Sequence, residues 1–210
     1  MGRQLAGTIL VLARHGETDW NRTHRWQGHT GPRLNAKGRR QARQLASELG
    51  SIDAIYSSDS DRARETAEIV AASRGISVVT DARLREVNFG EWEGLTRHEI
   101  DRDYAGAFTR WEACEPPLPA GVEPDEAMAA RVLEALLEIA ERHVRDRVLV
   151  VTSGGPIRAA EAHLRALSQT IARREIPTVE NGAILAIEVG TDIFRAAYYV
   201  ENPETRDRTF

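Results

Sequence analysis

Short runs of β-branched and aliphatic residues alternate along the chain with segments whose apolar residues recur at helical spacing. The runs cover residues 8–13, 52–57, 76–79, 147–152, 183–189 and 194–200, and such runs are typical of buried strands. Helical stripes follow Asn35, Ser60, Asp125 and Gly154. Strands that alternate with helices predict a mostly parallel sheet covered on both faces. The last two runs are adjacent and predict an antiparallel hairpin at one edge.

Capping residues indicate where these helices begin and end. Asn35 is a good N-cap for the first helix, and Gly50 can close it. Ser58-Asp59-Ser60 offers N-caps for the second helix, which is expected to end at Gly75. Asp125 is expected to cap the long amphipathic helix that follows. Each predicted helix therefore has its own local start signal.

Two stretches between these elements have a different character. Residues 84–95 contain two glycines and no helical period, which predicts an ordered loop. Residues 96–124 form a short helical insertion that ends in the Pro-rich segment 116–121. We expect this insertion to be a flexible lid on a single domain that spans residues 1–210.

The composition excludes several classes of protein. A net charge of -4 and a sequence pI of about 5.9 do not favour nucleic acid or an anionic membrane as partner. The lone Cys114 rules out an internal disulfide and predicts a partly buried thiol in a reducing compartment. The apolar segment 5–13 lacks a signal-peptide cleavage site, and no run is long enough to span a bilayer. A cytoplasmic protein is expected, and a homodimer stays open.

Polar residues gather just after three of the predicted strands. These segments are Arg14-His15-Gly16, Ser57 to Arg62 and Ser153-Gly154-Gly155. Ligands of open α/β sheets bind at this carboxyl edge. Two arginines can clamp one anion there, and a helix N-terminus adds backbone N–H groups. The sequence therefore predicts a phosphate pocket around His15, whose imidazole acts either as a general base or as the nucleophile.

A metal-free phosphoryl transfer also needs a carboxylic acid that protonates the leaving oxygen. The loop 85–94 supplies three candidates, Glu86, Glu91 and Glu93. His24 and His29 lack convincing metal-ligand spacing, and no Asp or Cys completes a set with them. We therefore expect no metal ion.

Five ordered blocks give the sequence a family resemblance. They are Leu12-Ala13-Arg14-His15-Gly16-Glu17-Thr18-Asp19-Trp20-Asn21, Trp26-Gln27-Gly28, the segment 57–67, the segment 84–94, and Val150-Val151-Thr152-Ser153-Gly154-Gly155-Pro156-Ile157-Arg158. A lone Arg-His-Gly would be weak, but five blocks in this order are specific. The chain resembles branch 1 of the histidine phosphatase superfamily, the phosphoglycerate mutase-like proteins.

The resemblance implies a fold and a set of residue roles. The fold would be a three-layer α/β/α sandwich with a mostly parallel central sheet and an antiparallel edge. His15 would be the nucleophile that accepts the phosphoryl group, Arg14 and Arg62 would clamp the phosphate, and Glu86 would donate the proton and later activate water. The expected contacts to phosphate or substrate further include Asn21, Gln27, Gly28 and Gly154. The family needs no metal or organic cofactor.

Ser153 departs from the family pattern, because the resemblance implies a second catalytic histidine at this position. Serine donates one hydrogen bond but carries no positive charge. Three interpretations stay open: an engineered inactivating change, a natural enzyme of weak or altered activity, and a phosphate-binding relative without turnover. Since Arg14, His15, Arg62 and Glu86 are present, a phosphatase is favoured over a binding protein.

The expected function is hydrolysis of a small phosphorylated metabolite through a phosphohistidine at His15, impaired by Ser153. The alternatives are phosphoglycerate mutase activity and binding of a phospho-ligand without catalysis. The segment 89–94 resembles the phosphatase members more than the glycolytic mutases. The lid at 96–124 is expected to select the substrate.

Overall fold

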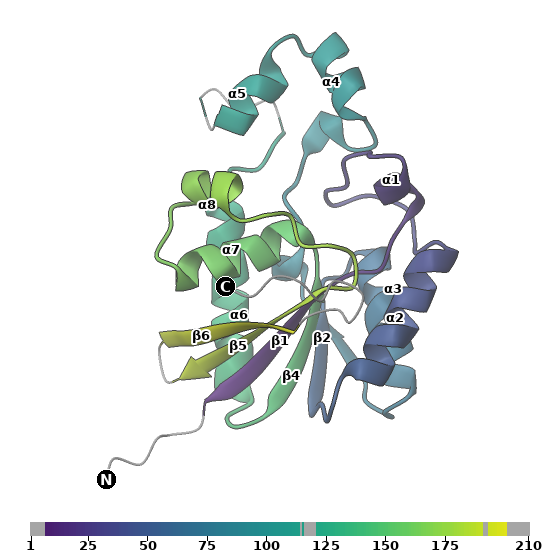
Figure 1. Cartoon of the computed structure of the whole chain (residues 1–210), viewed down its shortest axis with the longest axis vertical. Helices are drawn as coiled ribbons and strands as arrows, with labels where there is room; N and C mark the ends of the chain where they lie inside the picture. Colours follow the sequence, from purple (N-terminus) through teal and green to yellow (C-terminus); the bar gives the residue numbers. More distant parts are fainter. Residues whose placement is uncertain (1–6, 114, 116–120, 191–192, 201–210) are drawn as a thin grey trace.

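One mixed sheet organises the molecule. The computed structural model describes residues 7–113, 115, 121–190 and 193–200. Over this range the strands lie in the order β3-β2-β4-β1-β5-β6 (Figure 1). Their bounds are β1 Thr8–Arg14, β2 Ala54–Ser57, β3 Val78–Thr80, β4 Arg147–Thr152, β5 Ile184–Gly190 and β6 Ile193–Val200. Strands β1 to β4 pair in parallel, and β5 and β6 add the predicted antiparallel edge.

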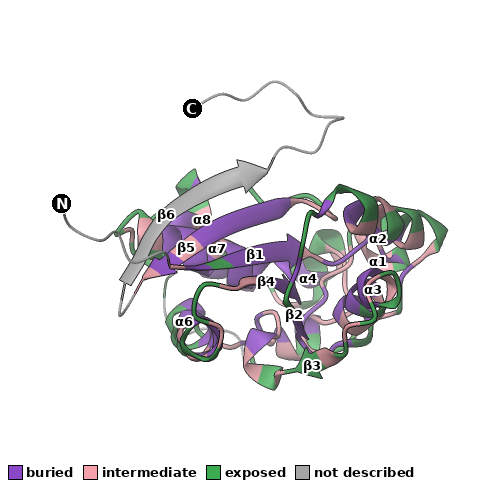
Figure 2. Cartoon of the chain, turned by 90° about the horizontal axis from the view of Figure 1, so that it is seen from below, coloured by how far each residue is buried: buried purple, intermediate pink, exposed green. Residues whose placement is uncertain are grey.

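Helices cover both faces of the sheet, which confirms the three-layer sandwich. Helices α2 (Ala36–Glu48) and α3 (Asp61–Ala72) pack on one face, and α6 (Asp125–Arg142) and α7 (Gly154–Leu164) pack on the other (Figure 1). Alternate residues of β1 point to opposite layers, because side chains of a strand alternate between its faces. The buried strands lie between the helical layers in Figure 2.

Some predicted boundaries agree with the structure and others do not: α3 ends at Ala72 rather than Gly75, and the runs 52–57 and 76–79 form the shorter strands β2 and β3. Asn35 caps α2 by accepting a hydrogen bond from the backbone N–H of Gly38. Asp125 is the first residue of α6 rather than its cap, a position held by Pro124. The Asp125 carboxylate instead forms an ion pair with Arg173, so a tertiary contact takes the place of the expected local cap.

Two short helices were not predicted. These are α1 (Asp19–Arg22), which is one turn long, and α8 (Gln169–Glu175), in which Ala172 is the buried residue. Neither is long enough to show a helical period. The capping box of Thr18 and Asn21 is the local signal that could have located α1.

The loop and the insertion that follow β3 lie above the carboxyl ends of the strands (Figure 1). The loop contains two 3₁₀ turns, η1 (Ala82–Leu84) and η2 (Gly90–Trp92), and the insertion contains α4 (Arg97–Asp103) and α5 (Ala107–Ala113). The predictions for Cys114 and for the Pro-rich residues 116–120 lie outside the described residues. In the part of the chain that the structure describes, no helix combines the length and the hydropathy needed to cross a bilayer.

Candidate active site

The ends of β1, β2 and β4 meet at one point of the sheet edge. In the register of these strands, Ala13 and Ser57 both lie opposite Val151. The His15 backbone N–H donates to the Thr152 carbonyl at 2.9 Å, and the next residues of each strand leave the sheet together. Three segments far apart in sequence thus converge where the sequence predicts a phosphate pocket.

The hydrogen bonds of His15 define its tautomer. Its Nδ1 lies 2.8 Å from the Gly16 carbonyl oxygen, which can only accept, so Nδ1 carries the hydrogen. Its Nε2 lies 3.1 Å from Nε of Arg62, which can only donate, so Nε2 is the unprotonated nitrogen. The imidazole therefore holds a lone pair on Nε2, the nitrogen beside the arginine.

Burial and charge keep this imidazole neutral. His15 is 2% exposed, and desolvation lowers its pKa well below the usual value of 6.5. The positive charges of Arg62 and Arg14 lower the pKa further. A neutral imidazole at physiological pH is the form that can attack an electrophile or accept a proton.

Arg62 is fixed on the buried side of the site. Besides the contact to His15, its Nη2 donates to the Gly28 carbonyl at 2.6 Å and its Nη1 to the Thr30 carbonyl at 3.1 Å. The residue is 1% exposed. Its position on the first turn of α3 follows from the capping segment before that helix. The guanidinium is therefore oriented before any ligand arrives.

Arg14 approaches the same place from the end of β1. Its Nη1 donates to the Val179 carbonyl, while its Nε is buried without a hydrogen-bond partner among the described residues. A Cβ built on Gly154 would lie 3.9 Å from the Arg14 guanidinium. A buried donor without a partner is costly unless a ligand or water satisfies it. Arg14 and the start of α7 thus form one concave surface with capacity for an anion.

Glu86 is held against the first turn of α7. Its Oε2 accepts from the Gly155 N–H at 3.0 Å, and its Oε1 accepts from the Val87 N–H at 2.9 Å. A Cβ on Gly155 would lie 2.0 Å from the carboxylate, so only glycine admits Glu86 here. The sequence predicts that α7 offers its N–H groups to an anion, but one of them binds this carboxylate instead.

Two glycine backbones bring α2 directly against the His15 loop. A Cβ on Gly16 would lie 2.4 Å from the Gly38 carbonyl oxygen, and a Cβ on Gly38 would lie 2.1 Å from the Glu17 carbonyl oxygen. Each separation is too short for any side chain at either position. The loop that presents His15 is therefore fixed by backbone contact with a core helix.

Ser153 occupies the N-cap position of α7 without acting as a cap. It is 2% exposed, its hydroxyl makes no side-chain cap hydrogen bond, and its Oγ is buried without a partner among the described residues. Ser153 immediately precedes Gly154 and Gly155, which line the adjacent pocket. We call Arg14, His15, Arg62, Glu86 and Ser153 the floor of the site.

Asn21 and Gln27 belong to a polar network beside His15. Thr18 donates through its hydroxyl to Gln27 at 2.8 Å and through its backbone N–H to Asn21 at 3.0 Å. Asn181 donates to the His15 carbonyl at 2.9 Å and to Asn21 at 3.3 Å. The contact of Asn181 with His15 spans 166 residues, so no local signal predicted it.

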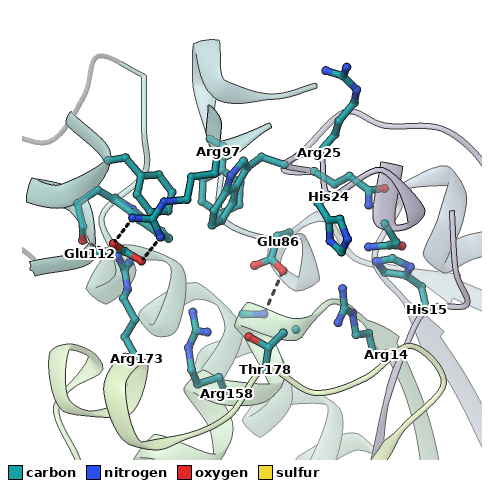
Figure 3. Close-up of a pocket in the computed structure, with 18 residues that line it drawn as sticks. Arg14, His15, His24, Arg25, Glu86, Arg97, Glu112, Arg158, Arg173 and Thr178 are labelled. Atoms are coloured by element: carbon teal, nitrogen blue, oxygen red, sulfur yellow. Dashed lines mark hydrogen bonds and ion pairs between the residues drawn. The ribbon is translucent and has the colours of Figure 1, made fainter. Parts of the chain in front are cut away.

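A pocket of about 510 Å³ opens above the floor (Figure 3). Six of the predicted site residues line it, namely Arg14, His15, Asn21, Gln27, Glu86 and Gly154. Arg62, Gly28 and Ser153 do not belong to this lining, and the Gly28 carbonyl accepts a hydrogen bond from Arg62. The sequence did not indicate the other polar side chains of the lining, which are His24, Arg25, Arg97, Glu112, Arg158, Arg173 and Thr178. The spacing of Arg158, one helical turn after Gly154, was the signal available for it.

Aromatic and charged residues form the rest of the lining. We call this set the wall: Arg25, Trp26, Phe89, Arg97, Phe108, Trp111, Glu112, Arg158 and Arg173. Trp26 packs against three aromatic rings at centroid distances of 4.8–5.6 Å. Members of α4 and α5 therefore contribute directly to the pocket.

Most cations of the wall are already paired. Arg25 forms an ion pair with Glu99, Arg97 with Glu112, and Arg173 with Asp125. Arg158 makes no ion pair or hydrogen bond with any described residue, and its side chain extends toward the pocket in Figure 3. It is the wall cation with capacity for a ligand anion.

Metal ligation is not indicated in the described part of the chain. No cluster of three or more His, Cys, Asp or Glu side chains there has the arrangement of a metal site.

Comparison with known proteins places this geometry in a family. The profile of the "Histidine phosphatase superfamily (branch 1)" matches residues 10–202. The chain is 36% identical over 155 residues to phosphoserine phosphatase 1 of Hydrogenobacter thermophilus, with 71% of this chain and 72% of the relative covered. It is 38% identical over 165 residues to glucosyl-3-phosphoglycerate phosphatase of Mycobacterium tuberculosis, with 74% of each covered.

A solved structure supports the same assignment. The structure of Bacillus stearothermophilus YhfR superimposes with a TM-score of 0.83 at 37% identity, covering 90% of this chain and 94% of that chain. The fold, the family profile and the named relatives therefore agree. The chain belongs to branch 1 of the histidine phosphatase superfamily and is an enzyme of that phosphatase family.

Proposed function

We propose that the protein hydrolyses small phosphomonoesters through a phosphohistidine formed on Nε2 of His15. The observation that carries the proposal is the neutral His15 imidazole, whose Nδ1–H is bound to Gly16 and whose Nε2 lone pair lies beside the Arg62 guanidinium. This arrangement presents a nucleophile next to the charge that would stabilise a transferring phosphoryl group.

The first step forms the phosphoenzyme. The Nε2 lone pair of His15 attacks phosphorus, and the phosphorus–oxygen bond to the ester breaks. A protonated Glu86 transfers its proton to the departing oxygen, so that an alcohol leaves. Arg14 and Arg62 neutralise charge on the phosphoryl oxygens. The orphaned Nε of Arg14 supports its part in this role, because a phosphoryl oxygen would satisfy that donor.

The second step returns the enzyme to its starting state. The Glu86 carboxylate removes a proton from water, the water oxygen attacks phosphorus, and the phosphorus–nitrogen bond breaks. Inorganic phosphate leaves, Glu86 is again protonated, and the electron pair returns to Nε2 of His15. The Gly155 and Val87 N–H groups keep the carboxylate in place through both steps.

Ser153 weakens this site. The family resemblance implies a histidine there that would add a charged donor to the phosphoryl group. The Ser153 hydroxyl is buried, has no hydrogen-bond partner among the described residues, and cannot carry that charge. Loss of one such donor costs on the order of 10²–10³ in rate. We therefore propose an enzyme that is impaired relative to a Ser153→His variant rather than inactive.

The substrate is proposed to be a small metabolite that carries a second anionic group. The relatives act, by their names, on phosphoserine and glucosyl-3-phosphoglycerate. In this chain Arg158 is unpaired and lies one helical turn beyond Gly154 on α7, about 6 Å along the helix axis. A substrate carboxylate close to the phosphoester would fit this position of Arg158. The insertion 96–124 is proposed to select the substrate through Phe108 and Trp111.

Hydrolysis of p-nitrophenyl phosphate tests the proposal. The native chain, His15→Ala and Ser153→His are compared, with thermal unfolding of each as a control for folding. The expected result is turnover by the native chain above His15→Ala and a gain of about 10²–10³ in Ser153→His. The native chain should also take up an acid-labile ³²P label from a labelled substrate, and His15→Ala should not. Native turnover equal to that of His15→Ala would overturn the proposal and favour a phospho-ligand binding protein.

A further inference from the structure

We propose that His24 supplies a second imidazole to the phosphoryl group, in the role that Ser153 cannot fill. This inference rests on the proposed function and concerns how this particular chain completes its site. Its basis is the position of His24, its backbone conformation and the lack of any competing partner for its side chain.

His24 lies over the floor of the pocket. It follows α1 and lines the same pocket as Arg14, His15 and Glu86. In Figure 3 its imidazole points into the pocket, above Arg14 and between Glu86 and His15. A phosphoryl group bound to Nε2 of His15 and to Arg14 would therefore face this ring.

The backbone of His24 adopts a left-handed conformation, which is uncommon for residues other than glycine. Its φ is 53°, in the left-handed region that favours glycine. The following residue is fixed on both sides, since the Arg25 N–H donates to the Trp20 carbonyl at 2.8 Å and the Arg25 guanidinium binds Glu99 at 2.8 Å. Strain that the surroundings enforce in this way is found preferentially at functional sites.

The imidazole of His24 has no structural task in the described chain. Its side chain makes no hydrogen bond or ion pair with any described residue, and it is exposed to the pocket. The histidine ring therefore does not stabilise the turn that strains it. Its ring N–H remains available to a ligand oxygen.

The chemistry of His24 complements what Ser153 lacks. The Ser153 hydroxyl is buried and cannot carry positive charge. An imidazole can donate a charge-assisted hydrogen bond to a phosphoryl oxygen. The paired arginines of the wall are held by carboxylates, so His24 is better placed than they are to add a donor. Its role is hydrogen bonding and charge, with no bond formed to phosphorus.

A double-mutant cycle between positions 24 and 153 tests this role. His24→Gly is the informative variant because glycine accepts a φ of 53° without strain, so the turn should fold. In the native background we expect kcat/KM for p-nitrophenyl phosphate to fall about 10–100-fold. In the Ser153→His background the same change should cost less than about threefold. Equal losses in both backgrounds, or no loss in either, would overturn the proposal.

Two further measurements separate a chemical role from a structural one. Added free imidazole should restore activity to His24→Gly, whereas a structural defect would not respond. The matched control is His98→Ala, since His98 is exposed on α4 outside the pocket, and it should keep native activity. Failure of imidazole to raise the rate at any concentration, with a folded variant, contradicts the inference.

Binding of inorganic phosphate keeps the test independent of turnover. Calorimetric titration of the native chain and His24→Gly should show about tenfold weaker binding in the variant, as expected for loss of one hydrogen bond to a charged group. If the native chain lacks His15-dependent hydrolysis but His24→Gly still binds phosphate more weakly, the proposed function fails and the His24 contact stands. Equal dissociation constants would refute the contact itself.

Discussion

The floor and the wall of the pocket are built by different means. On the floor, His15, Arg62 and Ser153 are at most 2% exposed, and Glu86 is held by two backbone N–H groups. On the wall, buried aromatic rings such as Phe108 and Trp111 stand beside exposed charged groups, since the side chains of the ion pair Arg97–Glu112 are 56% and 44% exposed. Exposed pairs of this kind contribute little to stability.

This difference separates chemistry from selection. The floor groups are oriented by the ends of three strands and by backbone contacts, and such preorganisation is what transition-state stabilisation requires. The wall is carried by loop and helical segments above the sheet edge (Figure 1), where side chains can change without disturbing the sheet. We therefore expect floor substitutions to act on kcat and wall substitutions to act on KM.

The largest effect is expected at Glu86 of the floor. Glu86→Gln has nearly the same shape and keeps an oxygen that can accept a hydrogen bond from Gly155, but it cannot donate the proton. Hydrolysis of an alkyl phosphate should fall about 10²–10⁴-fold in kcat, the usual contribution of a general acid. For p-nitrophenyl phosphate, whose leaving group needs little protonation, formation of the phosphoenzyme should be much less affected.

Burst kinetics separate the two steps for Glu86→Gln. An initial burst of p-nitrophenol followed by slow turnover is expected, because water activation also depends on Glu86. A similar loss of phosphoenzyme formation for the alkyl and aryl substrates would show that Glu86 does not protonate the leaving oxygen.

An intermediate effect is expected at Arg158 of the wall. Arg158→Met should raise KM for O-phosphoserine about 10–100-fold, as expected for loss of a hydrogen bond between charged groups. KM for O-phosphoethanolamine, which lacks the carboxylate, should stay within about twofold. Arg174→Met is the matched control, because Arg174 is exposed on α8 outside the pocket. Equal changes in KM for the two substrates would show that Arg158 does not bind the substrate carboxylate.

The smallest effect concerns stability and pH. The folded-state pKa of His15 lies well below 6.5, whereas an unfolded histidine titrates near 6.5. As pH falls through about 6.5, His15 of the unfolded chain takes up a proton, whereas His15 of the folded chain stays neutral. The free energy of unfolding therefore decreases until the pH has passed the pKa of His15 in the folded chain. This part of the stability is fully present above about pH 6.5.

Comparison with His15→Asn isolates this contribution, since the other histidines are shared. Urea unfolding at pH 8, 6.5 and 5 should show the native chain losing stability relative to His15→Asn at the lower pH values. A stability difference that does not vary with pH would mean that His15 is as easily protonated in the folded chain as in the unfolded one.

The sequence was sufficient for the sheet and for the part of the floor that lies at strand ends. Arg14 and His15 follow a clear apolar run, and strand ends converge by topology, so their placement needed no tertiary information. Glu86 was predicted as one of three acidic residues of the loop 85–94 and was singled out by the family resemblance. Its contact with Gly155 depends on a helix 69 residues away, which no local pattern indicates.

The sequence did not indicate that His24 lines the pocket. It lies in a loop without periodicity, and its direction depends on a left-handed φ and on Arg25, which is bound to a glutamate 74 residues later. Long-range contacts of this kind have no signature within the loop itself. Arg158 differs, because its helical spacing from Gly154 is visible in the sequence. That it has no ion-pair partner, unlike the other arginines of the wall, is visible only in the structure.

The close contact between Gly16 and Gly38 has a consequence for how this enzyme could acquire new substrates. Because neither position admits even a methyl group, a random library that includes them would consist mostly of clones that fail to fold. Diversity placed at Arg158, Arg97 and Glu112 would avoid that loss, because the last two side chains are 56% and 44% exposed. The two glycines thus mark the boundary between the part of the molecule that directed evolution must inherit unchanged and the part that it can explore.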